Sequence, residues 1–348
     1  MKKIPSLDGL RAISILIVLI GHARFSPGVP EWLTNALRLA INEELGVYIF
    51  FVISGFLITH LLLSEKTEFR QIDIKKFYIR RALRILPVAY IYIFFIWLIN
   101  HKYSLGIRND LFVHAATYTT NFVVMGTWLL GHLWSLGVEE QFYLIWPWVV
   151  RKNLKTIIYL SLAIIFYAPV SRFIFDAFPE YRIMFLCPFF NYADSLMIGA
   201  LLGISWHAQS KIWNSSLVMN RFFFCFCFAL MWMASLLDYS QNFRLIAFPF
   251  GRTVIGICAA FIIMRAISVK EGWIYGFLNH PFVSYIGVLS YSIYIWQQFF
   301  FFKKSFPDAD VWWRAFPFNF IVAFLVATAS YYCWEKFFLK LKTYFKVV

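Results

Sequence analysis

The chain has 348 residues, of which 61% are hydrophobic, 21% are aromatic and only 14% are charged. This composition excludes an ordinary soluble globular protein and indicates a chain that is solvated largely by lipid. The formal net charge of +14 would suggest nucleic-acid binding in a soluble protein. In a membrane protein, lysine and arginine gather in cytoplasmic loops instead, so we expect a lipid bilayer as partner and no nucleic acid.

Neither the N-terminus nor the cysteines indicate a secreted, disulfide-stabilised protein. Lys2 and Lys3 precede an apolar run as in a signal peptide, but Arg11 and His22 interrupt that run. No small-x-small cleavage site follows, so we interpret the run as a retained first helix. The five cysteines lie in apolar stretches and lack metal-ligand spacing, so we expect no disulfide framework and no metal.

The hydropathy pattern predicts an all-α, polytopic integral membrane protein. Ten apolar windows are long enough to cross a bilayer as helices. They cover about 8–25, 46–64, 82–100, 133–150, 155–172, 189–206, 221–238, 248–267, 283–302 and 316–335. The segment 111–130 is more polar, and we interpret it as an outer loop or a partly inserted hairpin. We expect one membrane domain over residues 1–348, with no soluble extension.

The distribution of basic residues predicts the orientation. With a cytoplasmic N-terminus, the inner segments carry 19 of the 32 lysines and arginines and the outer segments carry 10. Most of the excess comes from the loop 65–81, and the C-terminal tail is also basic. Because cytoplasmic loops are enriched in positive charge, both termini are expected in the cytoplasm and the protein in the inner (plasma) membrane.

The first helix carries two ionisable residues on one face. Arg11 and His22 are eleven positions apart, which brings both onto the same side of a helix, roughly 16 Å apart along its axis. Ionisable groups at membrane depth are costly and usually mark a pathway or a site. Alternatively, Arg11 reaches the headgroups and His22 lies at the far interface.

The helix expected at 133–150 carries two adjacent carboxylates, Glu139 and Glu140, at a depth similar to that of His22. Two anions inside a span must be protonated, paired or hydrated. The structural alternative is that one of them neutralises an arginine such as Arg172 or Arg252 and the other faces the headgroups.

Two further patterns lie on the two helices expected between the first helix and the helix at 133–150. Ser54 and Gly55 form a small-residue notch, which serves close helix packing more often than nucleophilic chemistry. Arg81 and Arg84 share a helix face at the cytoplasmic mouth. They would serve as topogenic charge and lipid-phosphate contacts in many membrane proteins, but Arg84 lies inside the span, where a bidentate anion would be a favourable partner.

Four ordered motifs resemble the acyltransferase-3 family of integral membrane acyltransferases. The match is continuous from Leu7 to about Trp148 and weaker to Glu335. The motifs are Leu7-Asp8-Gly9-Leu10-Arg11-Ala12 with His22, Phe50-Phe51-Val52-Ile53-Ser54-Gly55-Phe56, Arg81-x-x-Arg84-x-x-Pro87, and Trp134-Ser135-Leu136-x-x-Glu139-Glu140-Gln141-Phe142-Tyr143. The resemblance implies transfer of an acyl group, usually acetyl from acetyl-CoA, to a hydroxyl of an extracytoplasmic or lipid-linked carbohydrate.

The resemblance also implies roles for individual residues. His22 would be the essential histidine and Arg11 its partner, while Arg81 and Arg84 would be the basic pair at the donor end. The helix with Glu139 and its neighbours would be the active-site helix. The remaining residues expected at or near the site are Ser54, Trp134, Glu140, Gln141 and Tyr143.

The sequence departs from the family pattern at two positions. A histidine often follows the motif that ends at Trp296, where this chain has Gln297, and a proline often follows the last-helix glutamate, where this chain has Phe337. Both departures weaken an expected role for the last two helices. The frequent esterase-like extension is also absent, which favours a stand-alone enzyme.

A mechanism follows as a hypothesis. The CoA phosphates would bind Arg81, Arg84 and Arg11, and His22 would take the proton of the acceptor hydroxyl as it attacks the thioester. Glu139 or Glu140 would orient the imidazole. A covalent acyl-His22 intermediate is the rival route. A carrier or flippase for lipid-linked sugar, without acyl transfer, is the alternative function, and a membrane scaffold is a third.

Overall fold

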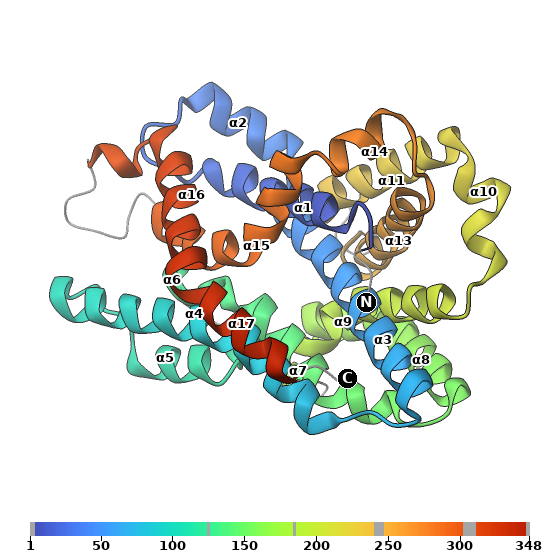
Figure 1. Cartoon of the computed structure of the whole chain (residues 1–348). Helices are drawn as coiled ribbons and strands as arrows, with labels where there is room; N and C mark the ends of the chain where they lie inside the picture. The colour runs from blue at the N-terminus through green and yellow to red at the C-terminus, as the bar shows by residue number, and fades with distance from the viewer. Residues whose placement is uncertain (1–3, 124–125, 184–185, 240–246, 302–310, 346–348) are drawn as a thin grey trace. The chain divides into compact units, whose positions relative to one another are not determined.

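The computed structural model describes residues 4–123, 126–183, 186–239, 247–301 and 311–345, and every regular element in these ranges is helical (Figure 1). The all-α prediction is therefore confirmed. Among these described residues, six helices are long and apolar enough to cross a membrane: Glu44–Phe69, Ile74–Tyr103, Leu154–Ala177, Cys187–His207, Arg221–Asp238 and Ala247–Ser268. The expected ten spans and the side of each terminus stay predictions. The basic residues Lys2, Lys3 and Lys346 lie outside the described ranges.

The chain divides into two compact units, each assembled from three separate stretches of sequence. The first unit comprises Met1–Val18, Asn42–Ile72 and Phe142–Val288, and the second comprises Leu19–Ile41, Asp73–Gln141 and Leu289–Val348. Three helices contribute residues to both units: α1 (Leu7–Ala23), α7 (Leu133–Val150) and α15 (Pro281–Phe300).

The first unit is built around α3 (Glu44–Phe69) and α9 (Cys187–His207), which pack along each other. Helix α8 (Leu154–Ala177) packs against α9, and α11 (Arg221–Tyr239) packs against α13 (Arg252–Ser268). The short helices α10 (Ser216–Met219) and α14 (Gly272–Leu278) complete the unit.

Glycine allows α3 and α9 to approach closely. A Cβ added at Gly55 would lie 2.0 Å from the carbonyl oxygen of Leu196, and one added at Gly199 would lie 2.1 Å from that of Val52. Such distances leave no room for any side chain. Gly55 belongs to the small-residue notch that the sequence shows at Ser54 and Gly55. In the structure Gly55 lies at a close contact between two helices.

Gly55→Ala is therefore expected to destabilise the protein by about 1–3 kcal/mol or more, because the added methyl group forces two backbones apart. Thermal unfolding in detergent would measure the loss. Gly276→Ala is the matched control, since a Cβ at Gly276 in α14 meets nothing within 4 Å. Equal unfolding temperatures for the two variants would contradict the close-packing argument.

The second unit is built around α4 (Ile74–Tyr103), the longest helix in the described ranges. The Asp73 side chain caps its N-terminus by accepting a hydrogen bond from the backbone N–H of Lys76. The other helices of this unit are α2 (Glu31–Ala40), α5 (Asn109–Ala116), α6 (Trp128–Gly131), α16 (Phe318–Ser330) and α17 (Lys336–Leu341).

The C-terminal helices lie beside α4 in the second unit (Figure 1). The Trp334 indole donates a hydrogen bond to the carbonyl oxygen of Pro87 at 2.9 Å, and Arg80 donates one to the carbonyl oxygen of Phe345 at 3.0 Å. The segment 111–130 forms short helices rather than one long one, among those of its residues that are described. Whether it enters the membrane stays a prediction.

Candidate active site

His22 lies near the end of α1 and is buried in the second unit. Only 8% of the residue is exposed, and its Nδ1 lies 2.8 Å from Oε1 of Gln297 on α15, which is itself fully buried. The indole of Trp128 contacts the imidazole edge-on, with 5.2 Å between ring centroids. Trp128 is fixed in turn, because its indole N–H donates to the backbone carbonyl of Gln298 at 2.9 Å.

The start of α7 is attached to the same part of α15. His132 is buried and its Nε2 donates a hydrogen bond to the carbonyl oxygen of Ile295 at 3.0 Å. The hydroxyl of Tyr294 donates to the backbone carbonyl of His132 at 2.8 Å. His132 is also an electrostatic neighbour of His22. Gln297, Trp128 and His132 therefore lie around His22 near the end of α1.

Gln141 binds the segment that precedes α7. Its side-chain amide donates to the carbonyl oxygen of Tyr118 and to Oδ1 of Asn121, both at 2.9 Å, and its Oε1 accepts from Asn121 at 3.1 Å. A Cβ at Gly137, one turn earlier, would lie 2.8 Å from the same Tyr118 carbonyl. The segment around 118–121 is therefore packed directly on α7, and Gln141 holds it there.

A second polar cluster contains Glu140 and the two arginines of α4. Glu140 has Glu139 and Arg81 as charged neighbours, and its Oε1 is buried without a hydrogen-bond partner in the described part of the chain. Glu335 accepts a hydrogen bond from the Ser292 hydroxyl at 2.6 Å and has Arg84 as a charged neighbour.

Two tyrosines are electrostatic neighbours of these charged groups. Tyr291 has Glu335, Glu140 and Arg84 among its electrostatic neighbours, and its hydroxyl donates to the carbonyl oxygen of Ile85 at 2.6 Å. Burial, and secondarily the charge of Glu140, raises the pKa of the Tyr118 hydroxyl well above its usual range. Tyr118 therefore stays a neutral group beside the carboxylate.

The structure adds neighbours that the sequence does not predict. From sequence, we expect Glu139 and Glu140 at the depth of His22, and Arg81 and Arg84 at the cytoplasmic mouth. In the structure, Glu140 has Arg81 as a charged neighbour, and Nδ1 of His22 contacts the side-chain amide of Gln297. Tyr118 and Asn121 are bound to Gln141 of α7, and Trp128 is bound to α15. The roles of both carboxylates stay predictions.

The other predicted site residues are distributed over both units. Arg11 lies in the first unit and forms an ion pair with Asp8 at 3.8 Å. Ser54 is half-buried on α3, Trp134 is half-buried on the first turn of α7, and Tyr143 is buried further along α7 beside the ring of Phe142. Their chemical roles stay predictions.

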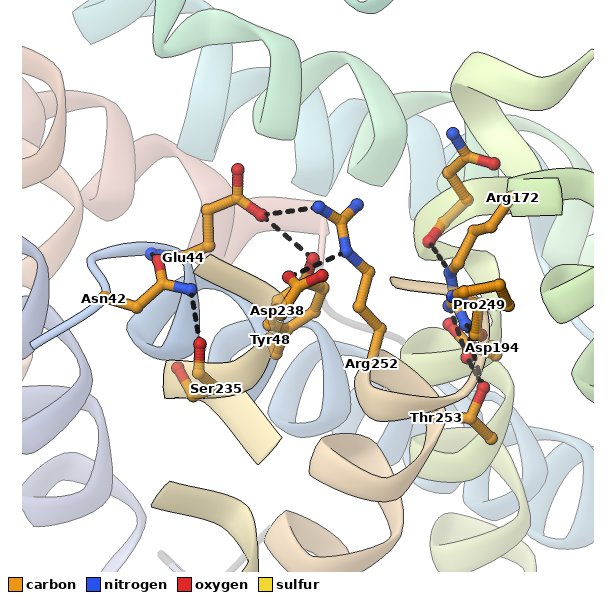
Figure 2. Close-up of polar contacts among 11 residues, drawn as sticks. Asn42, Glu44, Tyr48, Arg172, Asp194, Ser235, Asp238, Pro249, Arg252 and Thr253 are labelled. Atoms are coloured by element: carbon orange, nitrogen blue, oxygen red, sulfur yellow. Dashed lines mark hydrogen bonds and ion pairs between the residues drawn. The ribbon is translucent and has the colours of Figure 1, made fainter. Parts of the chain in front are cut away.

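Figure 2 shows where Arg172 and Arg252 find their partners. Arg172 and Asp194 form a fully buried ion pair in the first unit. Arg252 pairs with Glu44 at 3.2 Å and with Asp238 at 3.1 Å. Both arginines therefore have carboxylate partners other than Glu139 and Glu140, and the structural alternative for those two glutamates loses its proposed partners.

Sequence reasoning assigns no site role to four residues that the structure brings to these clusters: Trp128, His132, Glu335 and Gln297. Gln297 is the clearest case. In the sequence it stands out only as a departure from the family pattern, which weakens an expected role for its helix. A polar residue in the middle of an apolar helix is the signal that could have identified it.

Several relatives that match this chain are named O-acetyltransferases. In Staphylococcus aureus (strain COL), a protein named a putative O-acetyltransferase is 28% identical over 325 residues, which cover 85% of this chain and 50% of the relative. The putative peptidoglycan O-acetyltransferase YrhL of Bacillus subtilis (strain 168) is 25% identical, over 84% of this chain and 48% of the relative. The peptidoglycan O-acetyltransferase OatA of Listeria monocytogenes serovar 1/2a is 32% identical over 42% of this chain and 24% of its own length.

This chain spans about half the length of the first two of these relatives. No solved structure matches the chain. The family described as an acyltransferase domain matches residues 4–335, which contain every helix that bears a predicted site residue. The chain therefore belongs to the acyltransferase-3 family of membrane acyltransferase domains.

Proposed function

We propose that this protein is a membrane-embedded O-acetyltransferase that moves an acetyl group from acetyl-CoA to a hydroxyl of a cell-envelope carbohydrate. The observation that carries the proposal is the buried His22, whose Nδ1 is engaged by Gln297 while its ring is held by Trp128. An imidazole fixed in this way has one nitrogen left for proton transfer, which is what acyl transfer to a hydroxyl requires.

In the proposed reaction, the acceptor oxygen attacks the thioester carbonyl carbon while His22 takes the proton of the hydroxyl. The tetrahedral intermediate then collapses, the carbon–sulfur bond breaks and the thiolate of CoA leaves. The imidazolium returns its proton to this thiolate. The products are an acetyl ester and free CoA, and His22 is neutral again. The covalent acyl-His22 route would differ by forming an acyl–nitrogen bond first.

The donor's phosphates would bind on α4. Arg84 is half-buried and forms no hydrogen bond or ion pair within the described ranges, so its N–H donors are available to an anion. Arg81 lies in the same cluster, with its guanidinium over the ring of Phe77. A guanidinium pair suits the bidentate geometry of phosphate. Because the sequence places this end of α4 next to the most basic loop, we propose that acetyl-CoA arrives from the cytoplasm.

Arg84→Gln is expected to raise the KM for acetyl-CoA roughly tenfold or more, since it removes a charge-assisted contact with a phosphate. The kcat should change much less, because the contact persists in the transition state. Steady-state kinetics of the purified protein in nanodiscs would separate the two. Arg108→Gln is the control, because Arg108 is exposed and pairs with Asp110. An unchanged KM in Arg84→Gln would remove Arg84 from the donor site.

Peptidoglycan is the acceptor that we propose first, because YrhL and OatA carry that substrate in their names. The test is mass spectrometry of peptidoglycan and other envelope glycans from cells that express this chain or its His22→Ala variant. A glycan that gains an acetyl group only with the intact histidine would establish reaction and acceptor together. Sugar translocation without acetyl-CoA turnover would instead identify a carrier.

A further inference from the structure

Gln297 contacts His22, the proposed base, and neither the sequence motifs nor the comparisons assign Gln297 a role. It lies on α15, fully buried, 275 positions from His22 in the sequence, and its Oε1 is 2.8 Å from the imidazole Nδ1. The backbone carbonyl of the next residue, Gln298, receives the indole N–H of Trp128. One turn of α15 therefore holds both the imidazole and the aromatic ring beside it.

The contact with Oε1 determines which nitrogen of His22 is the base. An amide oxygen accepts hydrogen bonds and cannot donate them, so Nδ1 must carry the proton. The lone pair of the neutral ring is then on Nε2, which is the atom available to the acceptor hydroxyl. A triad carboxylate fixes its histidine in the same way but adds a negative charge, which Gln297 lacks. Gln297 orients the base without adding that charge.

The other half of the same amide has no partner. Nε2 of Gln297 is buried and forms no hydrogen bond within the described part of the chain. Buried amide N–H groups are almost always satisfied, and a donor left open beside a reactive group is a candidate for binding the substrate. During acyl transfer, negative charge develops on the thioester carbonyl oxygen, and a preorganised N–H donor stabilises it.

We propose that Gln297 acts through both ends of its amide: Oε1 fixes the tautomer of His22, and Nε2 donates a hydrogen bond to the carbonyl oxygen of the acyl group as it becomes an oxyanion. This inference rests on the proposed acyl transfer. A neutral imidazole at this position would offer the same two groups, because it accepts a hydrogen bond with one nitrogen and donates with the other.

Three substitutions separate the two roles. Gln297→Glu keeps an acceptor for Nδ1–H but has no N–H to donate, so the tautomer of His22 should persist while kcat falls about a hundredfold. Gln297→Leu removes both groups and should also release the tautomer. Gln297→His retains both and should keep more activity than either. Gln71→Leu, the same change at an exposed glutamine, is the control.

The tautomer is measured independently of activity by 15N NMR of the histidine-labelled protein in nanodiscs, with the His22 signal assigned from its loss in His22→Asn. A His22 signal in Gln297→Leu identical to that of the wild type would overturn the positioning role. A wild-type kcat in Gln297→Glu would overturn the donor role. If the wild-type protein transfers no acetyl group, the proposed function and the donor role both fail, and the NMR spectra still decide whether Gln297 fixes the imidazole.

Discussion

His22→Ala is expected to lower the rate of acetyl transfer by at least about a hundredfold, because it removes the group that takes the acceptor's proton. The loss should appear in kcat, since the imidazole contributes mainly to the transition state. Transfer from acetyl-CoA to the envelope glycan would be measured with purified protein in nanodiscs. The Trp128 ring, which packs on the imidazole, should stay in place because its indole is anchored to the backbone of Gln298.

The matched control is His101→Ala, since His101 is exposed at the end of α4 and stacks on Trp97. It should leave the rate unchanged. Acid quenching of the wild-type reaction, followed by mass spectrometry of the peptide containing His22, would detect an acyl-imidazole if the covalent route operates. A His22→Ala variant that transfers acetyl at the wild-type rate would place the base elsewhere in the protein.

The fold class was predictable from sequence because hydropathy reports burial in lipid one segment at a time. The helices that contain Phe56, Ile96 and Leu202 each include a long, predominantly apolar stretch, and each appears in the structure. The packing of Gly55 against Leu196 was only partly predictable. A small-residue notch identifies a close contact, but it does not identify the helix on the other side.

The site was predictable where one motif carries the chemistry and unpredictable where two distant segments meet. His22 stands out because it interrupts an apolar helix, and the structure shows it buried among polar groups. Its partner Gln297 is 275 positions away, and spacing along one helix carries no information about that pairing. The depth of Glu140 in the membrane can be predicted from sequence, but depth does not determine its charged neighbours, one of which is Arg81.

Removing the buried charge of Arg172 is expected to destabilise the first unit by about 3–5 kcal/mol, because the charge of Asp194 would remain without its counter-ion. Neither side chain of this pair is exposed (Figure 2). Arg172 also donates hydrogen bonds to the carbonyl oxygens of Asn191 at 2.9 Å and Pro249 at 2.7 Å. The guanidinium therefore joins α8, α9 and the turn before α13, and Arg172→Met should loosen all three.

The double variant Arg172→Met/Asp194→Leu tests the electrostatic part of this prediction. Removing both charges avoids an unpaired buried ion, so the double variant should be more stable than the sum of the two single changes predicts. The double variant should still be less stable than the wild type, because the Thr253 hydroxyl also loses its partner. This hydroxyl donates a hydrogen bond to Asp194 at 2.6 Å. The unfolding free energies of the wild type, the two single variants and the double variant, measured in detergent, give the coupling energy between Arg172 and Asp194. Arg108→Met, which breaks an exposed pair, should leave stability unchanged. Strict additivity of the two single changes would show that packing, and not the buried charge, makes Arg172 necessary.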